Sequence, residues 1–198
     1  IRVVSEDFTP DRTQRRILRA NADLTISEMP ARATAEQFTL FQRYQKNRHA
    51  DGDMAAMGYY DYRAMIEDTP ISTGILEFRD ARDRLVGACL TDWLADGLSA
   101  VYSFFDTDED KRSLGTFAVL WLIGRARSLG LPYVYLGYWV PGSPKMSYKA
   151  KFAGVEVYTD GAWSPIGDPE SHDASLNPLT SMPIAEQVAK INLPTSRS

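Results

Sequence analysis

The chain has 198 residues, of which 44% are hydrophobic and 11% aromatic, values that are typical of a globular protein with a core to bury. Its net charge of -4 argues against indiscriminate nucleic-acid binding, and its longest apolar run, from Phe117, is too short to span a bilayer, so no membrane partner is expected. The single Cys89 excludes an intramolecular disulfide and fits a cytoplasmic location. Because only His49 and His172 accompany it, no metal site is expected.

The first predicted helix carries a basic face. It begins at Thr9-Pro10 and runs to about Asn21, and four arginines lie on it at i, i+3, i+4 and i+7: Arg12, Arg15, Arg16 and Arg19. Like charges on one face lower helix stability unless an anion binds them. A phosphate backbone is one such anion, and acidic residues elsewhere in the chain are the alternative.

The remaining elements change from helices to strands. Helices are predicted from Thr34 to His49, over about 59–67, over 113–129 and from Ser143, and strands over 72–79, 84–93, 98–105, 133–137 and 155–158. This order predicts a mixed, largely antiparallel α/β sheet with flanking helices, an acetyltransferase-like (GNAT-type) acyl-transfer fold. We expect that domain over 34–166. Residues 1–33 would continue a missing N-terminal region, and 167–198 would form a loop-rich tail with a weak helix near 184–191.

The junction before the helix at Ser113 is informative about whether the chain binds coenzyme A. In acetyltransferase-like folds this junction binds the pyrophosphate through an Arg/Gln-x-x-Gly-x-Gly/Ala pattern. The segment RSLGTF supplies Arg112 and Gly115 but ends in Phe117. We expect Phe117 to crowd a phosphate, so coenzyme A binding is disfavoured and no cofactor is expected.

The stretch VPGSPKMSYKAKF concentrates positive charge. Ser143-Pro144 predicts a helix N-terminus, which is already positive, yet Lys145 lies in its first turn and Lys149 follows at i+4. This pattern indicates an anion site, and a solvated helix end is the alternative.

Several segments resemble the C-terminal part of the arginyl-tRNA–protein transferase family: YQKNRHADGDM, DYRAMIED, LSAVYSFFD, SLGTFAVL and, most specifically, GYWVPGSPKMSYKAKFAGVEVY. The spacing is most similar to the bacterial branch. That branch transfers leucine from leucyl-tRNA to an N-terminal Asp or Glu and marks proteins for degradation (the N-degron pathway), whereas the eukaryotic branch transfers arginine. Family members begin with a region of clustered cysteines, which the 198 residues do not include and which we expect to precede Ile1.

The resemblance implies aminoacyl-tRNA, with leucyl-tRNA favoured, and proteins with acidic N-termini as partners. An aminoacyl ester is already activated and its attacker is a free α-amine, so positioning can supply much of the catalysis and no nucleophilic side chain is needed. Cys89 lies mid-strand like a core residue.

The following residues are candidates for these roles. Each could instead have a purely structural role, in the core, at a helix end or in an ion pair. Lys145, Tyr148 and Lys149 would bind the acidic side chain or the terminal tRNA phosphates. Arg48 and His49 would read an acidic group, and Asp92 or Glu156 would orient or deprotonate the amine. The aminoacyl pocket, or a stack on the terminal adenine, would be built by Tyr102, Ser103, Tyr138 and Trp139, with Tyr138 favoured. The candidate catalytic residues are therefore Lys145, Tyr148, Asp92 and Glu156, and the four arginines of the first helix are tRNA-backbone candidates.

Three rival functions remain open. An arginyl-transferring enzyme would need an acidic pocket, where a leucyl enzyme needs an apolar one. A coenzyme A-dependent N-acetyltransferase would need a junction that admits phosphate. A non-catalytic tRNA- or degron-binding module would need only the basic faces.

Overall fold

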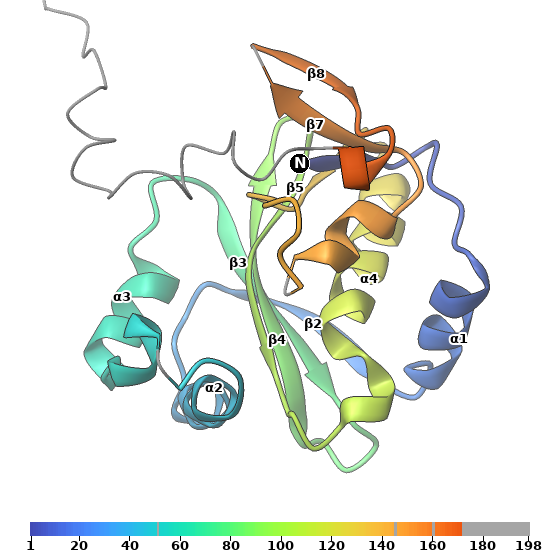
Figure 1. Cartoon of the computed structure of the whole chain (residues 1–198). Helices are drawn as coiled ribbons and strands as arrows, with labels where there is room; N and C mark the ends of the chain where they lie inside the picture. The colour runs from blue at the N-terminus through green and yellow to red at the C-terminus, as the bar shows by residue number, and fades with distance from the viewer. Residues whose placement is uncertain (51, 145, 160, 172–198) are drawn as a thin grey trace, which may run out of the picture.

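An eight-stranded sheet runs through the molecule, with helices packed on both of its faces (Figure 1). The computed structural model describes residues 1–50, 52–144, 146–159 and 161–171. The strands are β1 (Arg2–Val4), β2 (Thr25–Pro30), β3 (Thr73–Arg79), β4 (Leu85–Leu94), β5 (Gly97–Phe105), β6 (Tyr133–Tyr135), β7 (Val155–Thr159) and β8 (Ala162–Pro165). The helices are α1 (Arg12–Ala20), α2 (Ala35–Arg48), α3 (Tyr59–Glu67) and α4 (Leu114–Ser128), with short 3-10 helices η1 (Asp53–Ala56), η2 (Asp110–Arg112), η3 (Ser147–Lys151) and η4 (Pro169–Ser171).

The strand order is β2-β3-β4-β5-β6-β1-β7-β8, and every neighbouring pair is antiparallel except β5 and β6. The predicted mixed, largely antiparallel α/β sheet is therefore confirmed. The parallel pair is short, because only Gly97–Ser99 of β5 pairs with Tyr133–Tyr135 of β6. Beyond Ser99, β5 continues to Phe105 while β6 has ended. The sheet is therefore open on that side of β5, and the candidate site lies there.

The first 33 residues contribute two strands, β1 and β2, to the same sheet as the later strands. β1 lies between β6 and β7, and β2 pairs with β3 along its whole length. The strands β2 and β8 were not predicted, because each is an edge strand whose residues are mostly exposed and show no apolar alternation. An edge strand that buries little gives no periodic signal, and Pro30 adds a residue that disfavours strands.

The sheet separates two apolar clusters. Helices α1 and α4 cover one face, and α2 and α3 cover the other (Figure 1). Side chains alternate between the faces, so that Leu76 of β3 belongs to the cluster under α4 while its neighbour Ile75 packs under α2 and α3. This burial on both sides explains why β3 and β4 read as nearly continuous apolar runs.

The predicted start of α2 at Thr34 is correct, whereas α1 begins at Arg12, after the predicted start at Thr9-Pro10, with Asp11 as its N-cap. The side chains of Asp11 and Thr34 each accept a hydrogen bond from the backbone three residues on, and Gln14 and Gln37 return one, which completes a capping box at α1 and at α2. No helix within the described residues is long and apolar enough to cross a bilayer.

The predicted α-helix from Ser143 is wrong. Within residues 146–152 the chain forms only the five-residue 3-10 helix η3, which begins at Ser147, and Gly142 precedes it with a positive φ of 74°. Ser143 accepts backbone bonds from Met146 and Ser147. These bonds form an isolated turn, because the ladder of i to i+4 bonds does not continue. Lys145, His172 and the predicted helix near 184–191 lie outside the described residues.

Candidate functional site

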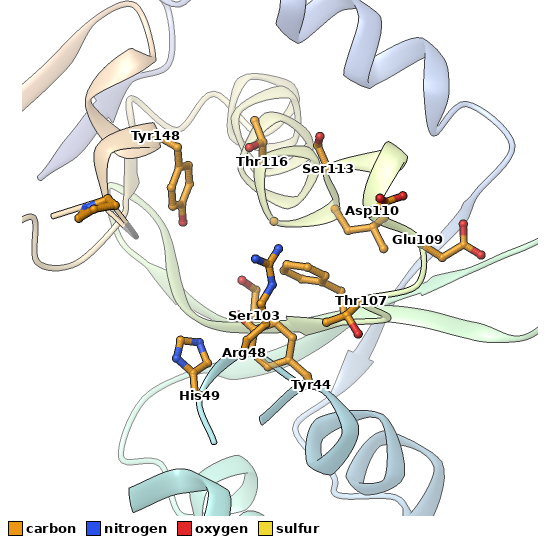
Figure 2. Close-up of a pocket in the computed structure, with 14 residues that line it drawn as sticks. Tyr44, Arg48, His49, Ser103, Thr107, Glu109, Asp110, Ser113, Thr116 and Tyr148 are labelled. Carbon is orange, nitrogen blue, oxygen red and sulfur yellow. The ribbon is translucent and has the colours of Figure 1, made fainter. Parts of the chain in front are cut away.

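A cavity of about 450 Å³ opens where β5 leaves β6, between the start of α4 and the end of α2 (Figure 2). Three groups of residues line it, contributed by the end of α2, by β5 with its following loop, and by the start of α4 with the η3 region. They are Tyr44, Arg48, His49, Ser103, Phe105, Thr107, Glu109, Asp110, Ser113, Leu114, Gly115, Thr116, Pro144 and Tyr148.

One wall is the N-terminus of α4. Ser113 precedes the helix in the left-handed conformation, with a φ of 52°, and its side chain makes no capping bond. The first N–H groups of an α-helix have no intrahelical acceptor, and the helix dipole is positive at this end. This wall therefore presents backbone donors where a carboxylate, a phosphate or a developing oxyanion is stabilised.

The opposite wall is the C-terminal end of α2. The Tyr44 ring packs on Phe105 with centroids 4.9 Å apart and on His49 at 5.5 Å. The Arg48 guanidinium lies 6.0 Å from the Phe105 centroid and is exposed at the cavity. Burial raises the pKa of Tyr44 to about 12, so its phenol stays neutral at physiological pH. The wall combines an aromatic surface with one permanent cation.

The acidic loop after β5 is neutralised by arginines. Asp106 is buried and pairs with Arg43 at 2.8 Å and Arg84 at 3.3 Å. Glu109 is bound by Arg84 at 2.7 Å and by Arg112 at 3.0 Å. The sequence DTDED therefore does not give the cavity a strongly acidic wall, although exposed Asp110 remains at its edge.

The expectation that Phe117 crowds the α4 N-terminus is wrong. Its ring is 4% exposed and packs edge-on against Phe78 in the core, with centroids 5.7 Å apart, so it points away from the cavity. Arg112, the other element of the coenzyme A pattern, is bound bidentately by Asp23 at 2.7 and 2.9 Å. Phe117 therefore departs from the pattern without obstructing the helix N-terminus, whereas Arg112 matches the pattern but is engaged by Asp23.

Tyr148 lines the cavity, and its neighbour Lys149 supports the wall behind it. Figure 2 shows the Tyr148 side chain directed into the cavity from the η3 side. Burial raises the pKa of the Tyr148 phenol. The Lys149 ammonium donates to the carbonyl oxygens of Leu136 and Tyr138 at 2.7 and 2.9 Å, and burial lowers its pKa. Lys149 therefore ties η3 to the segment that leaves β6.

The two predicted pocket tyrosines, Tyr102 and Tyr138, do not line the cavity. Tyr102 lies under α2 and accepts a hydrogen bond from Gln45 at 2.6 Å. Tyr138 is 74% exposed and does not line the cavity.

The two candidate acids are both partnered. Asp92 of β4 accepts a 2.6 Å hydrogen bond from Thr73. In the sheet it lies opposite Ser99 of β5, which is four residues before the cavity residue Ser103. Glu156 forms a 2.7 Å ion pair with Arg2 on the β1–β7 side of the sheet. The structure therefore does not bring either acid to the cavity. No group of three His, Cys, Asp or Glu side chains that could hold a metal occurs among the described residues.

The four arginines of α1 share one exposed surface, here called the arginine face: Arg12, Arg15, Arg16 and Arg19. None of the four forms an ion pair within the described part of the chain, and Arg15 donates to the Pro10 carbonyl oxygen at 2.7 Å. The alternative of compensation by acids elsewhere in the chain is therefore not observed among these residues.

Most cavity residues on α4 and in the preceding loop were missed as site residues. Arg48, His49, Ser103 and Tyr148 were predicted, whereas Tyr44, Phe105, Thr107 and the stretch 113–116 were not. A signal for this stretch was present, because the pattern at Gly115 marks a helix N-terminus that ligands approach in acetyltransferase-like folds.

Comparisons with known proteins define the class. The family model described as arginine-tRNA-protein transferase, C terminus, matches residues 36–159. The chain belongs to this family, as the sequence predicted.

Its relatives share one name. The chain is 53% identical over 197 residues to the aspartate/glutamate leucyltransferase of Dinoroseobacter shibae, covering 94% of this chain and 69% of the relative. It is 63% identical over 166 residues to that of Gluconacetobacter diazotrophicus, covering 84% and 64%. It is 51% identical over 208 residues to that of Paracoccus denitrificans, covering 99% and 74%. The chain thus spans roughly two thirds of the length of these curated relatives.

A solved structure of L-PGS from Bacillus licheniformis resembles the fold with a TM-score of 0.50 at 10% identity, covering 69% of this chain and 43% of that one. The likeness concerns the fold alone, and the acetyltransferase-like (GNAT-type) assignment stays a prediction.

Proposed function

We propose that this chain carries the transfer domain of an enzyme that moves leucine from leucyl-tRNA to the α-amine of proteins beginning with Asp or Glu. The observation that carries the proposal is its identity of 51–63% to relatives named aspartate/glutamate leucyltransferase. The partners are then leucyl-tRNA and proteins with acidic N-termini, and the reaction belongs in the cytoplasm with the N-degron pathway.

The cavity supports a leucyl rather than an arginyl donor. An arginine side chain needs an unpaired acid, but the Glu109 carboxylate is already held by Arg84 and Arg112. The apolar part of the lining, from Phe105, Leu114 and Pro144, is compatible with leucine. Asp110 forms no ion pair within the described residues, but it lies exposed at the edge of the cavity, where its charge is screened by solvent.

The two walls have the charges that this reaction needs. The amine attacks the ester carbonyl, and negative charge develops on its oxygen before the ribose hydroxyl leaves. The α4 N-terminus stabilises such an oxyanion, and Arg48 on the facing wall pairs with the acidic side chain of the acceptor. Lys145 keeps its proposed role as an anion-binding residue, now without the support of a helix N-terminus. Lys149 and Tyr148 act from the η3 wall.

A coenzyme A-dependent acetyltransferase is the second candidate, because Phe117 leaves the α4 N-terminus unobstructed. A transfer assay separates the candidates. Peptides beginning with Asp or Glu are mixed with the chain and with labelled leucyl-tRNA, arginyl-tRNA or acetyl-coenzyme A, and the full-length Gluconacetobacter relative serves as a positive control. A peptide with a blocked α-amine is the negative control. We expect label from leucyl-tRNA only. Label from arginyl-tRNA or acetyl-coenzyme A alone would replace the proposal, and tRNA binding without transfer would favour a binding module.

A further inference from the structure

Arg112 connects α1 to the cavity through both its side chain and its main chain. Its guanidinium donates to the Ala20 carbonyl oxygen at 3.0 Å and to both carboxylate oxygens of Asp23, just after α1. Its own carbonyl oxygen accepts a 2.8 Å bond from the Asn21 amide, which also caps the Ile17 carbonyl oxygen at 2.9 Å. The end of α1 is therefore held at one residue by several hydrogen bonds.

The same residue borders the cavity wall. Arg112 pairs with Glu109, a cavity residue, at 3.0 Å, and it immediately precedes Ser113, whose positive φ directs the chain into α4. A left-handed conformation at a non-glycine residue costs energy and persists only where its surroundings enforce it. The main-chain bond from Asn21 to the Arg112 carbonyl oxygen lies next to this residue, and the Arg112 guanidinium holds α1 at the same point, so α1 and the cavity wall meet at Arg112.

We propose that Arg112 is a positioning residue that sets α1, with its arginine face, at a fixed distance from the cavity. One aminoacyl-tRNA then contacts both places at once, with phosphates on the arginine face and the aminoacyl ester in the cavity. The inference rests on the proposed function. Its physical basis is that a ligand held at two places at once binds more tightly only while their separation matches the ligand, so a displaced α1 weakens tRNA binding and leaves the chemical step unchanged.

The geometry distinguishes Arg112 from an ordinary surface pair. Its side chain is 22% exposed and has three acceptor groups, the Ala20 carbonyl and the carboxylates of Asp23 and Glu109. The Arg63–Glu67 pair on α3 instead joins one turn of a single helix, with 56% of the Arg63 side chain exposed. Exposed pairs within one helix contribute little. Arg63→Gln is therefore the matched control, because it removes an arginine pair that touches neither α1 nor the cavity.

The test compares two donors in the transfer assay. One is leucyl-tRNA, and the other is leucine esterified to a three-nucleotide oligonucleotide with the acceptor-end sequence, which lacks the remaining phosphates of the tRNA. For Arg112→Gln we expect the KM for leucyl-tRNA to rise about tenfold with kcat within about twofold, and the short donor to be unaffected. Arg112→Lys should recover part of the loss, and Arg63→Gln should match the wild type with both donors.

Equal losses with both donors would overturn the proposal, because Arg112 would then only maintain the cavity. Unchanged activity with both donors would overturn it as well. Asp23→Asn is the second variant in case Arg112→Gln unfolds, since it weakens the tie to α1 and leaves the Glu109 pair intact. If the short donor is too poor a substrate, the salt dependence of tRNA binding replaces it. Arg112→Gln should then flatten the slope although the arginine face is unchanged, and an unaltered slope would refute the proposal. A wild-type chain that uses neither donor contradicts the proposed function itself.

Discussion

The backbone of Gly115 lies against the ring of Phe105, so that a methyl group added at position 115 would come within 3.1 Å of ring atom Cε1. This contact joins the first turn of α4 to the end of β5 and closes the cavity between them. The absence of a side chain lets the helix N-terminus approach the strand closely enough to share one pocket with it.

Gly115→Ala should therefore displace the Phe105 ring and lower transfer. A second glycine of α4 provides the control, because a Cβ at Gly124 would meet nothing within 4 Å. Gly124→Ala should raise the free energy of unfolding by about 0.5–1 kcal/mol through helix propensity, with transfer unchanged. Kinetics and chemical denaturation of both variants check this, and a fully active Gly115→Ala would contradict the role given to the contact.

Arg48→Ala should weaken the use of peptides with acidic N-termini. Charge-assisted hydrogen bonds contribute about 1.5–3 kcal/mol, so the KM for an Asp-starting peptide should rise about tenfold or more while the KM for leucyl-tRNA stays constant. Lys46→Ala removes a neighbouring exposed cation that does not line the cavity and should have no effect. Equal losses in the two variants would show a general charge effect rather than recognition at Arg48.

Lys149→Met should lower both stability and transfer, since the carbonyl oxygens of Leu136 and Tyr138 lose their shared donor and the Tyr148 wall loosens. Leaving such acceptors unpaired costs about 1–3 kcal/mol each when they are buried, and less where water reaches them. Lys151→Met, at an exposed site on the same 3-10 helix, is the control. Thermal unfolding and transfer rates are measured together. A variant that loses transfer at unchanged stability would instead indicate direct substrate contact by Lys149.

Removing two arginines of the arginine face should flatten the salt dependence of tRNA binding. Each lost phosphate contact lowers the slope of log K against log salt by about 1, so Arg12→Gln with Arg16→Gln should lower it by about 2. A second double variant, Arg63→Gln with Arg82→Gln, removes two positive charges at exposed positions outside α1 and controls for net charge. An unaltered slope in the double variant would remove α1 from the tRNA interface.

Cys89 should be dispensable for transfer. Burial raises the pKa of its thiol from 9.0 to about 11, so the nucleophilic thiolate is scarce at neutral pH. The raised pKa means that this group's contribution to stability is complete below about pH 9 and is lost as the pH rises towards 11. Wild type should therefore lose stability relative to Cys89→Ala by on the order of 2 kcal/mol between about pH 8 and pH 11. Denaturation at both pH values measures this, and inactivity of Cys89→Ala would overturn the assignment.

The sequence predicted the elements that carry strong local signals. Thr34 marked the start of α2, and the strands β3 and β4 are nearly continuous apolar runs. The helix expected at Ser143 carried the same kind of local signal but failed, because Gly142 reverses the chain and Lys149 is held by carbonyl oxygens distant in sequence. A local pattern contains no information about that tertiary contact.

The site was predictable only in part for the same reason. Arg48, His49 and Tyr148 belong to motifs that a family resemblance brings out, and the structure places all three at the cavity. Tyr44 and Thr107 read as ordinary helix and loop residues, and they reach the cavity only because β5 and β6 separate beyond Ser99. Asp92 and Glu156 looked like candidate bases because their partners, Thr73 and Arg2, are far away in sequence.

The place of β1 in the middle of the sheet has a consequence for how the molecule assembles. Residues 2–4 pair with 133–135 on one side and residues 2–3 with 155–156 on the other, so the first strand is bridged to partners that leave the ribosome far later. Loop closure over such separations is entropically unfavourable, and folds rich in distant pairings form slowly. During synthesis the hairpins from β3 to β5 can form early. The half of the sheet that contains β1 must wait for β7, and until then it presents open strand edges to other chains.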